Sequence, residues 1–150
     1  MKAGLRSVRR NSAELVRFRM KRQRVLTKPG PPRLEVVIGE AALRQQVGDH
    51  SIMKDQLEQL INVSGLAPVT LHVLPLSANV HLGIAGPFHI LSLRPPGQLI
   101  ATVVEDFTQC TFIENEAKVV TYERIFTYFQ GAALDPPSSL RLLKEIASAP

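Results

Sequence analysis

Four histidines and one cysteine are the side chains of this sequence best suited to metal binding or nucleophilic chemistry. His50, His72, His81 and His89 share no metal-ligand spacing, such as the i and i+4 pair that places two imidazoles on one helix face. Cys110 is the only cysteine and has no neighbouring base in the sequence to activate it, so we expect a buried, unreactive thiol. We therefore predict no catalytic residue, no metal and no cofactor.

The long segment Leu76–Pro87 is the best candidate for a binding loop. Its 12 residues lack helix or strand periodicity, and connections of that length often carry function. An acidic pair follows a predicted strand, where successive side chains point to opposite faces and so do not form a catalytic dyad. The candidate partner-binding or ligand-binding residues are Asn79, His81, Leu82, Phe88, Glu105 and Asp106. Two other interpretations stay open: the loop covers the end of a sheet, and the acids are a solvated strand end.

The hydrophobic pattern that must position these residues predicts a mixed α/β domain. Apolar residues at helical spacing alternate along the chain with runs in which every second residue is apolar. We expect helices over Ser12–Leu26, Ser51–Val63, Glu114–Gln130 and from Leu140 onward, and strands over Leu34–Ile38, Val69–Leu74, Phe88–Leu93 and Leu99–Val104. Because helices and strands intermix, the expected architecture is one mixed sheet of about four to five strands flanked by helices.

The chain divides by charge into a basic arm and an acidic body. Residues 1–33 hold eleven Lys or Arg against one Glu, a net charge of +10, whereas residues 34–150 hold seven cations and twelve acids, a net charge of −5. We therefore expect a basic arm with a helix over 1–33 and an α/β effector or interaction domain over 34–150. The arm can bind nucleic-acid phosphates, or it can neutralise an acidic body, its own or a partner's.

The helix expected in the arm has a thin apolar stripe that arginines interrupt. Such a stripe is too narrow to be buried alone, so we expect this helix to be a linker and the contact of a homodimer. The candidate dimer residues are Leu15, Phe18, Arg22 and Val25. The helix should end before Pro29-Gly30-Pro31-Pro32, because proline fixes φ and has no amide proton to donate.

Five groups of residues carry a resemblance to a known family. They are Glu40-Ala41-Ala42-Leu43-Arg44, Val47-Gly48, Met53 with Gln56-Leu57 and Leu60, Val69-Thr70-Leu71-His72-Val73-Leu74-Pro75, and Gly83-Ile84-Ala85-Gly86-Pro87-Phe88. In order and spacing they resemble the C-terminal domain of unknown function of actinobacterial XRE-type helix-turn-helix regulators of the WhiJ type. That resemblance implies an antitoxin-like regulator domain, no established catalytic residue and a small acidic partner protein. The helix-turn-helix that precedes the domain in the family is missing from this chain, so DNA binding would need an attached or partner helix-turn-helix.

A second resemblance concerns architecture alone. The predicted element order around Phe88–Leu91 and Val103–Phe107 is similar to half of a phospholipase D-like fold. The chemistry of that fold requires His-x-Lys, and here His89 is followed two positions later by Leu91. If the fold is phospholipase D-like, it lacks its catalytic motif.

The sequence thus favours a non-catalytic effector or protein-interaction domain of a bacterial transcription regulator. Binding of a partner would shift dimerisation or DNA affinity by mass action. The alternatives are a phosphodiesterase or nuclease of phospholipase D-like fold, or nucleic-acid binding through the basic arm. No apolar run approaches the roughly 18 residues of a membrane helix, and no signal peptide is evident, so we expect a cytoplasmic protein without membrane contact.

Overall fold

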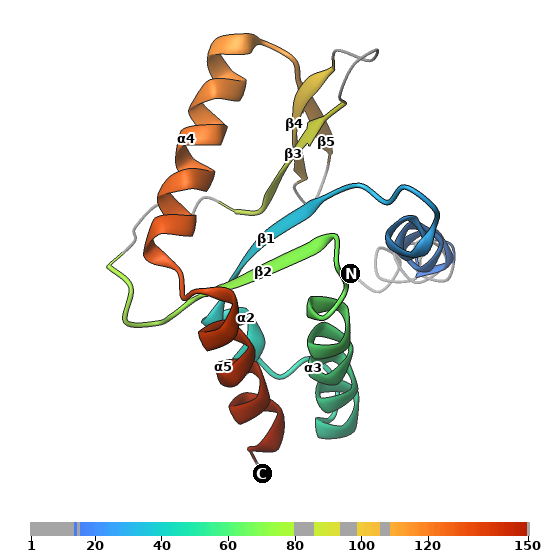
Figure 1. Cartoon of the computed structure of the whole chain (residues 1–150), viewed down its shortest axis with the longest axis vertical. Coiled ribbons are helices and arrows are strands. Elements are labelled where there is room, and N and C mark those ends of the chain that lie inside the picture. Colours follow the sequence, from blue (N-terminus) through green and yellow to red (C-terminus); the bar gives the residue numbers. More distant parts are fainter. Residues whose placement is uncertain (1–13, 15, 80–85, 94–98, 106–108, 150) are drawn as a thin grey trace, which may run out of the picture.

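The computed structural model describes residues 14, 16–79, 86–93, 99–105 and 109–149, and it has the expected mixed α/β composition. An N-terminal helix (residues 16–23) leads into the 3-10 helix η1 (Arg24–Thr27), and both stand at one side of the molecule (Figure 1). The other elements are β1 (Leu34–Gly39), α2 (Glu40–Arg44), α3 (His50–Ser64), β2 (Val69–Leu74), β3 (Phe88–Ser92), β4 (Ile100–Glu105), β5 (Cys110–Ile113), α4 (Glu116–Ala132) and α5 (Pro136–Ser148). Each predicted helix and strand is found, and β5 is an additional strand that the pattern did not predict.

The main hydrophobic core lies between the parallel pair β1–β2 and the helices α3 and α5. Its buried members are Leu43, Leu57, Leu71, Val73, Leu143 and Ile146. Helix α3 begins where the carboxylate of Asp49 accepts a hydrogen bond from the Ile52 amide, which satisfies one free donor of the first turn. The expected alternation in β2 is confirmed, because Val69, Leu71 and Val73 are buried while the residues between them are half-buried.

The outer edge of β2 is closed by the segment between α4 and α5. The amide of Val73 donates to the Ser139 hydroxyl oxygen at 2.8 Å, and the Val73 carbonyl accepts from the Leu134 amide at 2.9 Å. These groups occupy the bonding positions that a third strand would need. The prediction of one mixed sheet was therefore wrong in this respect: the five described strands form a two-stranded sheet, β1–β2, and a separate three-stranded sheet, β3–β4–β5.

The three-stranded sheet is antiparallel and packs against α4 on one face. The ring of Phe88 on β3 lies 5.0 Å from the ring of Tyr122 and 6.4 Å from that of Phe129, measured between centroids, so this face of the sheet contacts the helix. Val119, one turn before Tyr122, is buried. Helix α4 therefore links the two sheets, since its other end contacts β1 and β2 (Figure 1).

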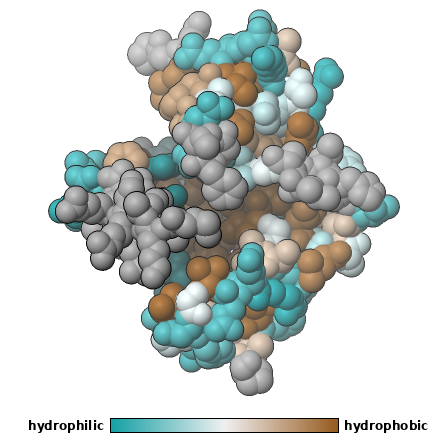
Figure 2. Space-filling view, turned by 180° about the vertical axis from the view of Figure 1, so that it is seen from behind, coloured by the Kyte–Doolittle hydropathy of each residue, from teal (hydrophilic) through white to brown (hydrophobic). Residues whose placement is uncertain are grey.

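The junction of the two sheets is visible from the back of the molecule. Figure 2 shows a hollow there with apolar side chains around it, between a largely hydrophilic lower part and an upper part of mixed character. No helix among the described residues combines the length and the apolar character needed to cross a membrane.

Candidate interaction surface

One face of the β3–β4–β5 sheet is apolar and has none of the labelled helices packed on it. Directly paired residues of antiparallel strands point to the same side, and Phe88 points toward α4. The residues one position along therefore point away from α4. These outward residues are His89, Leu91, Ala101, Val103, Glu105, Cys110 and Phe112. We call this side of the sheet the open face.

Large apolar side chains on the open face are accessible to solvent. Phe112 is 64% exposed and Leu91 is 48% exposed. Leu93 and Leu99 continue the same face, because the Leu93 amide donates to the Leu99 carbonyl at 2.8 Å and so extends the β3–β4 ladder. They are 59% and 40% exposed. On the central strand β4, Ala101 and Val103 of the same side are only 1% and 6% exposed, so the accessible apolar side chains lie on the edge strand β5, on β3 and at the end of the β3–β4 ladder. Exposed apolar side chains grouped in this way are typical of a protein–protein contact.

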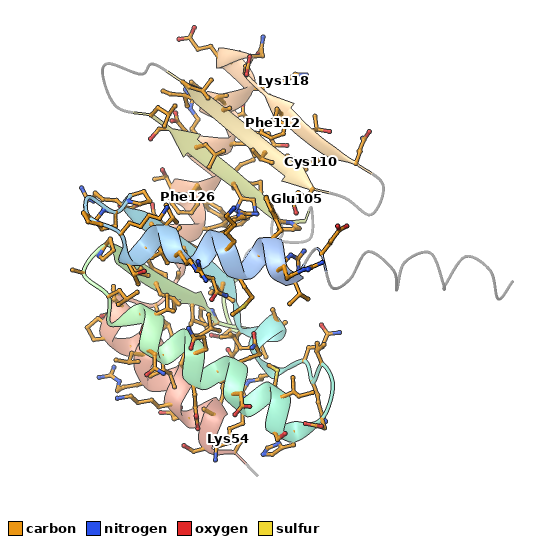
Figure 3. All side chains as sticks on the ribbon, turned by 90° about the vertical axis from the view of Figure 1, so that its right-hand side faces the viewer. Lys54, Glu105, Cys110, Phe112, Lys118 and Phe126 are labelled. Atoms are coloured by element: carbon orange, nitrogen blue, oxygen red, sulfur yellow. The ribbon has the colours of Figure 1, made fainter. Side chains whose placement is uncertain are left out.

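Polar groups mark one end of the open face. Cys110 opens β5 and pairs with Glu105, the last residue of β4, and both side chains are exposed. Figure 3 shows these two residues together with Phe112 on the three-stranded sheet. The expectation that Cys110 is buried was therefore wrong, because β5 is an edge strand and its outward side is not covered by a described helix.

The N-terminal helix is a second uncovered apolar surface. Val16, Phe18 and Met20 are between 56% and 60% exposed, and Val25 in η1 is also exposed. The guanidinium carbon of Arg22 lies 5.9 Å from the centre of the Phe18 ring, within the range of a cation–π contact. Of the residues proposed for dimer contact, Phe18 and Arg22 are thus exposed on this helix and Val25 is exposed on η1, while Leu15 lies outside the described residues.

The linker after this helix holds it away from the body. Residues 28–33 contain three prolines, and Gly30 has a φ of +66°, in the left-handed region that glycine adopts without strain. The chain then enters β1 at Leu34, whose amide donates to the Pro68 carbonyl. Figure 1 shows the helix beyond the edge of both sheets, on the side toward which the open face is turned.

The predicted binding loop is anchored at its start by a buried glutamate. The Glu40 carboxylate accepts hydrogen bonds from the Leu76 amide at 2.8 Å and from the Arg44 guanidinium at 2.7 Å. The bond from the Leu76 amide, followed by the contact with Arg44, holds the pKa of Glu40 below its ordinary value. Asn79 is exposed at the end of the described part of the loop, and the candidates His81 and Leu82 lie outside the described residues.

The remaining site candidates are separated by the fold. Phe88 packs against α4, whereas Glu105 is exposed on the opposite side of the sheet and Asp106 lies outside the described residues. His72 and His89 belong to different sheets, and the ring nitrogen Nδ1 of His72 lies 2.9 Å from the Leu134 carbonyl oxygen. Within the described residues no three His, Cys, Asp or Glu side chains gather as metal ligands would.

Sequence reasoning missed the open face itself. It rests on Phe112 and its neighbours in β5, a strand of four residues in which the first three are exposed. The signal that could have found it is the alternation of Thr111 and Ile113 with Cys110 and Phe112, which is shorter than a reliable strand pattern. Leu91, Leu93 and Leu99 fall within the predicted strands, but the pattern does not indicate that their side of the sheet is exposed.

These observations define a mixed α+β protein with two small sheets and two uncovered apolar surfaces. The model of the family DUF5753, a domain of unknown function, matches residues 2–145, and the chain therefore belongs to that family. No curated protein and no solved structure matches the chain.

Proposed function

We propose that this chain is a non-catalytic protein-interaction domain and that the open face of the β3–β4–β5 sheet is its binding surface. The observation that carries the proposal is the exposure of Leu91, Leu93, Leu99 and Phe112 on the side of the sheet that faces away from α4. Large apolar side chains gain about 25 cal/mol for each Å² removed from water, so a protein partner on this face is favoured strongly. Aromatic residues such as Phe112 are the side chains that most often dominate such contacts.

We further propose that the domain acts within a bacterial, antitoxin-like transcription regulator. The support is the resemblance of the segments around Glu40–Arg44 and Val69–Pro75 to the domain that follows an XRE-type helix-turn-helix in actinobacteria. Partner binding on the open face would then change the association of two regulator chains. That change alters DNA affinity by mass action, without any covalent step.

The first test replaces Phe112 with a charged residue. In the Phe112→Asp variant, a carboxylate on the open face has to be desolvated before any partner can pack there, so association should be lost. Val47→Asp is the matched control, because Val47 is equally exposed but lies in the loop between α2 and α3. Both side chains are mostly in water already, so the melting temperature of either variant should stay within about 2 °C of the parent.

Sedimentation equilibrium over a series of protein concentrations measures the result. We expect the parent chain and Val47→Asp to self-associate and Phe112→Asp to remain monomeric. If all three chains show the same molar mass at every concentration, the open face is not a protein-binding surface for this chain.

Nucleic-acid binding by the N-terminal helix is the second candidate function. Arg17, Arg19, Lys21, Arg22 and Arg24 are exposed, and none of them forms an ion pair with a described residue. Phosphate binding by these cations would release counterions, so the affinity would fall steeply with salt concentration. Fluorescence anisotropy with a labelled DNA duplex at two salt concentrations tests this candidate function. If the cations of the helix bind the DNA, the double variant Arg17→Gln/Lys21→Gln should abolish binding.

A further inference from the structure

We propose that the open face binds the N-terminal helix of a second copy of this chain, reciprocally, so that two identical helix-on-sheet contacts form one dimer. The proposal rests on the interaction function of the open face and names its partner. It starts from one juxtaposition: the helix that carries Phe18 and the face that carries Phe112 are both apolar, both uncovered and both turned to the same side of the molecule (Figures 1 and 3).

The first argument is that the helix needs a cover that its own chain does not provide. Phe18 remains exposed although it lies on the same side of the molecule as an apolar sheet face. The prolines of residues 29–32 stiffen the connection to β1 and hold the helix off the body. A second copy can approach from outside and is not restricted by that linker.

The second argument is charge. Residues 1–33 carry a net charge of +10 and residues 34–150 a net charge of −5, so the helix of one copy and the body of another attract each other. On the open face Glu105 is exposed beside Cys110, and on the helix Arg22 is exposed beside Phe18. An aromatic ring flanked by a cation therefore meets an apolar face flanked by a carboxylate.

The third argument is symmetry. Both halves of the contact are present on every chain, so a two-fold axis satisfies two helices and two faces at once. A direct face-to-face dimer would cover the two sheets but would leave Phe18 of both helices in water. The reciprocal arrangement covers both the open face and the side of the helix that carries Phe18.

Two variants break the two halves separately. Phe112→Asp damages the face and leaves the helix intact, whereas Phe18→Asp damages the helix and leaves the face intact. Covering an aromatic ring removes on the order of 100 Å² from water, which changes a dissociation constant by about 100-fold. A homodimer contains the damaged contact twice, so each variant alone should dissociate about 10,000-fold more readily and sediment as a monomer.

Mixing the two variants is the decisive experiment. In the mixed dimer the intact helix of the Phe112→Asp chain can pack on the intact face of the Phe18→Asp chain, so one of the two contacts is restored. We expect the mixture to form a dimer at concentrations at which each variant alone is monomeric. Each variant alone at the same total concentration is the control, and it should stay monomeric.

Cys110 provides an independent readout because it is the only cysteine and lies on the open face. Its reaction with a maleimide should be slow in the parent dimer and fast in Phe18→Asp alone. In the mixed dimer it should be slow only on the Phe18→Asp chain, whose face the intact helix covers. A merely destabilised chain would instead show faster labelling together with a lower melting temperature, which circular dichroism detects.

The outcomes separate this proposal from the function it rests on. If Phe112→Asp abolishes association and Phe18→Asp does not, the open face binds protein but the helix is not its partner. If both variants are monomeric and the mixture is too, the reciprocal arrangement is wrong. A parent chain that is monomeric at every concentration, or a helix whose only ligand is the labelled DNA duplex, overturns the proposal as well.

Discussion

Thr102 and Ser139 are two fully buried residues whose hydroxyl groups should affect stability in opposite directions. Both side chains are inaccessible to solvent. The Thr102 hydroxyl, in the central strand β4, has no hydrogen-bond partner among the described residues. The Ser139 hydroxyl accepts from the Val73 amide and donates to the Leu134 carbonyl at 3.1 Å. One group is therefore desolvated without compensation, and the other completes the edge of β2.

The expected magnitudes follow from this difference. Valine has the shape of threonine without its hydroxyl, so Thr102→Val removes an uncompensated buried polar group, which costs about 1–3 kcal/mol. We expect the free energy of unfolding to rise by about 1 kcal/mol, or the melting temperature by about 2–4 °C in a chain of this size. Ser139→Ala leaves the Val73 amide without its acceptor, so the free energy of unfolding should fall by about 1–3 kcal/mol.

Urea denaturation followed by circular dichroism measures both changes. The midpoints should move in opposite directions while the m-value stays constant, because neither variant alters the surface exposed on unfolding. Thr111→Val is the control, because Thr111 in β5 is exposed, and it should shift stability by less than about 0.5 kcal/mol. A Thr102→Val variant less stable than the parent would refute the reasoning, since it would mean that the hydroxyl makes a stabilising bond.

Three further predictions concern the carboxylates, the core and the dimer. Hydrogen bonds from backbone amides or neighbouring side chains lower the pKa of Glu40, Asp49 and Asp135 in the folded chain. The stabilisation by these carboxylates is therefore present at neutral pH and is lost as the pH falls below about 4. The urea midpoint should drop between pH 7 and pH 3, and the drop should be smaller for Glu40→Gln. Leu143→Ala should lower the free energy of unfolding by about 2–5 kcal/mol, because Leu143 is fully buried in the main core, and a loss below 1 kcal/mol in urea denaturation would argue against that packing. Raising the salt concentration should weaken the proposed dimer of oppositely charged surfaces in sedimentation equilibrium, whereas salt should strengthen a purely apolar contact.

The local elements of this fold could be predicted because their signals are local. Helix α3 has a capping aspartate and apolar residues at helical spacing, and β2 alternates over its whole length. The class of the fold follows from the order of such elements. The division into two sheets could not be predicted, because the outer edge of β2 is closed by a hydrogen bond from the Val73 amide to the Ser139 hydroxyl, and these residues are separated by 66 positions. Nothing in either residue's neighbours indicates that pairing.

Of the two exposed apolar surfaces, only the one on the basic N-terminal helix could be predicted from the sequence. Arginines that interrupt a thin apolar stripe indicated that the helix with Phe18 is uncovered, and the exposure of that side chain agrees. The open face could not be found in the same way, since Leu91 and Leu99 read as ordinary strand residues and give no sign of which side a helix covers. Which side of the sheet is covered depends on where α4 packs, and α4 packs through the contact of Tyr122 with Phe88.

The position of α5 in the chain has a consequence for folding during synthesis. The core of β2 and α3 is completed by Leu143 and Ile146, which are translated long after β2. At about 5–20 residues per second, β1, α3 and β2 wait roughly 4–15 s while the 74 residues from 75 to 148 are added. During that interval the nascent chain displays apolar side chains without their final cover, so general chaperones should engage it, and release should coincide with the emergence of α5.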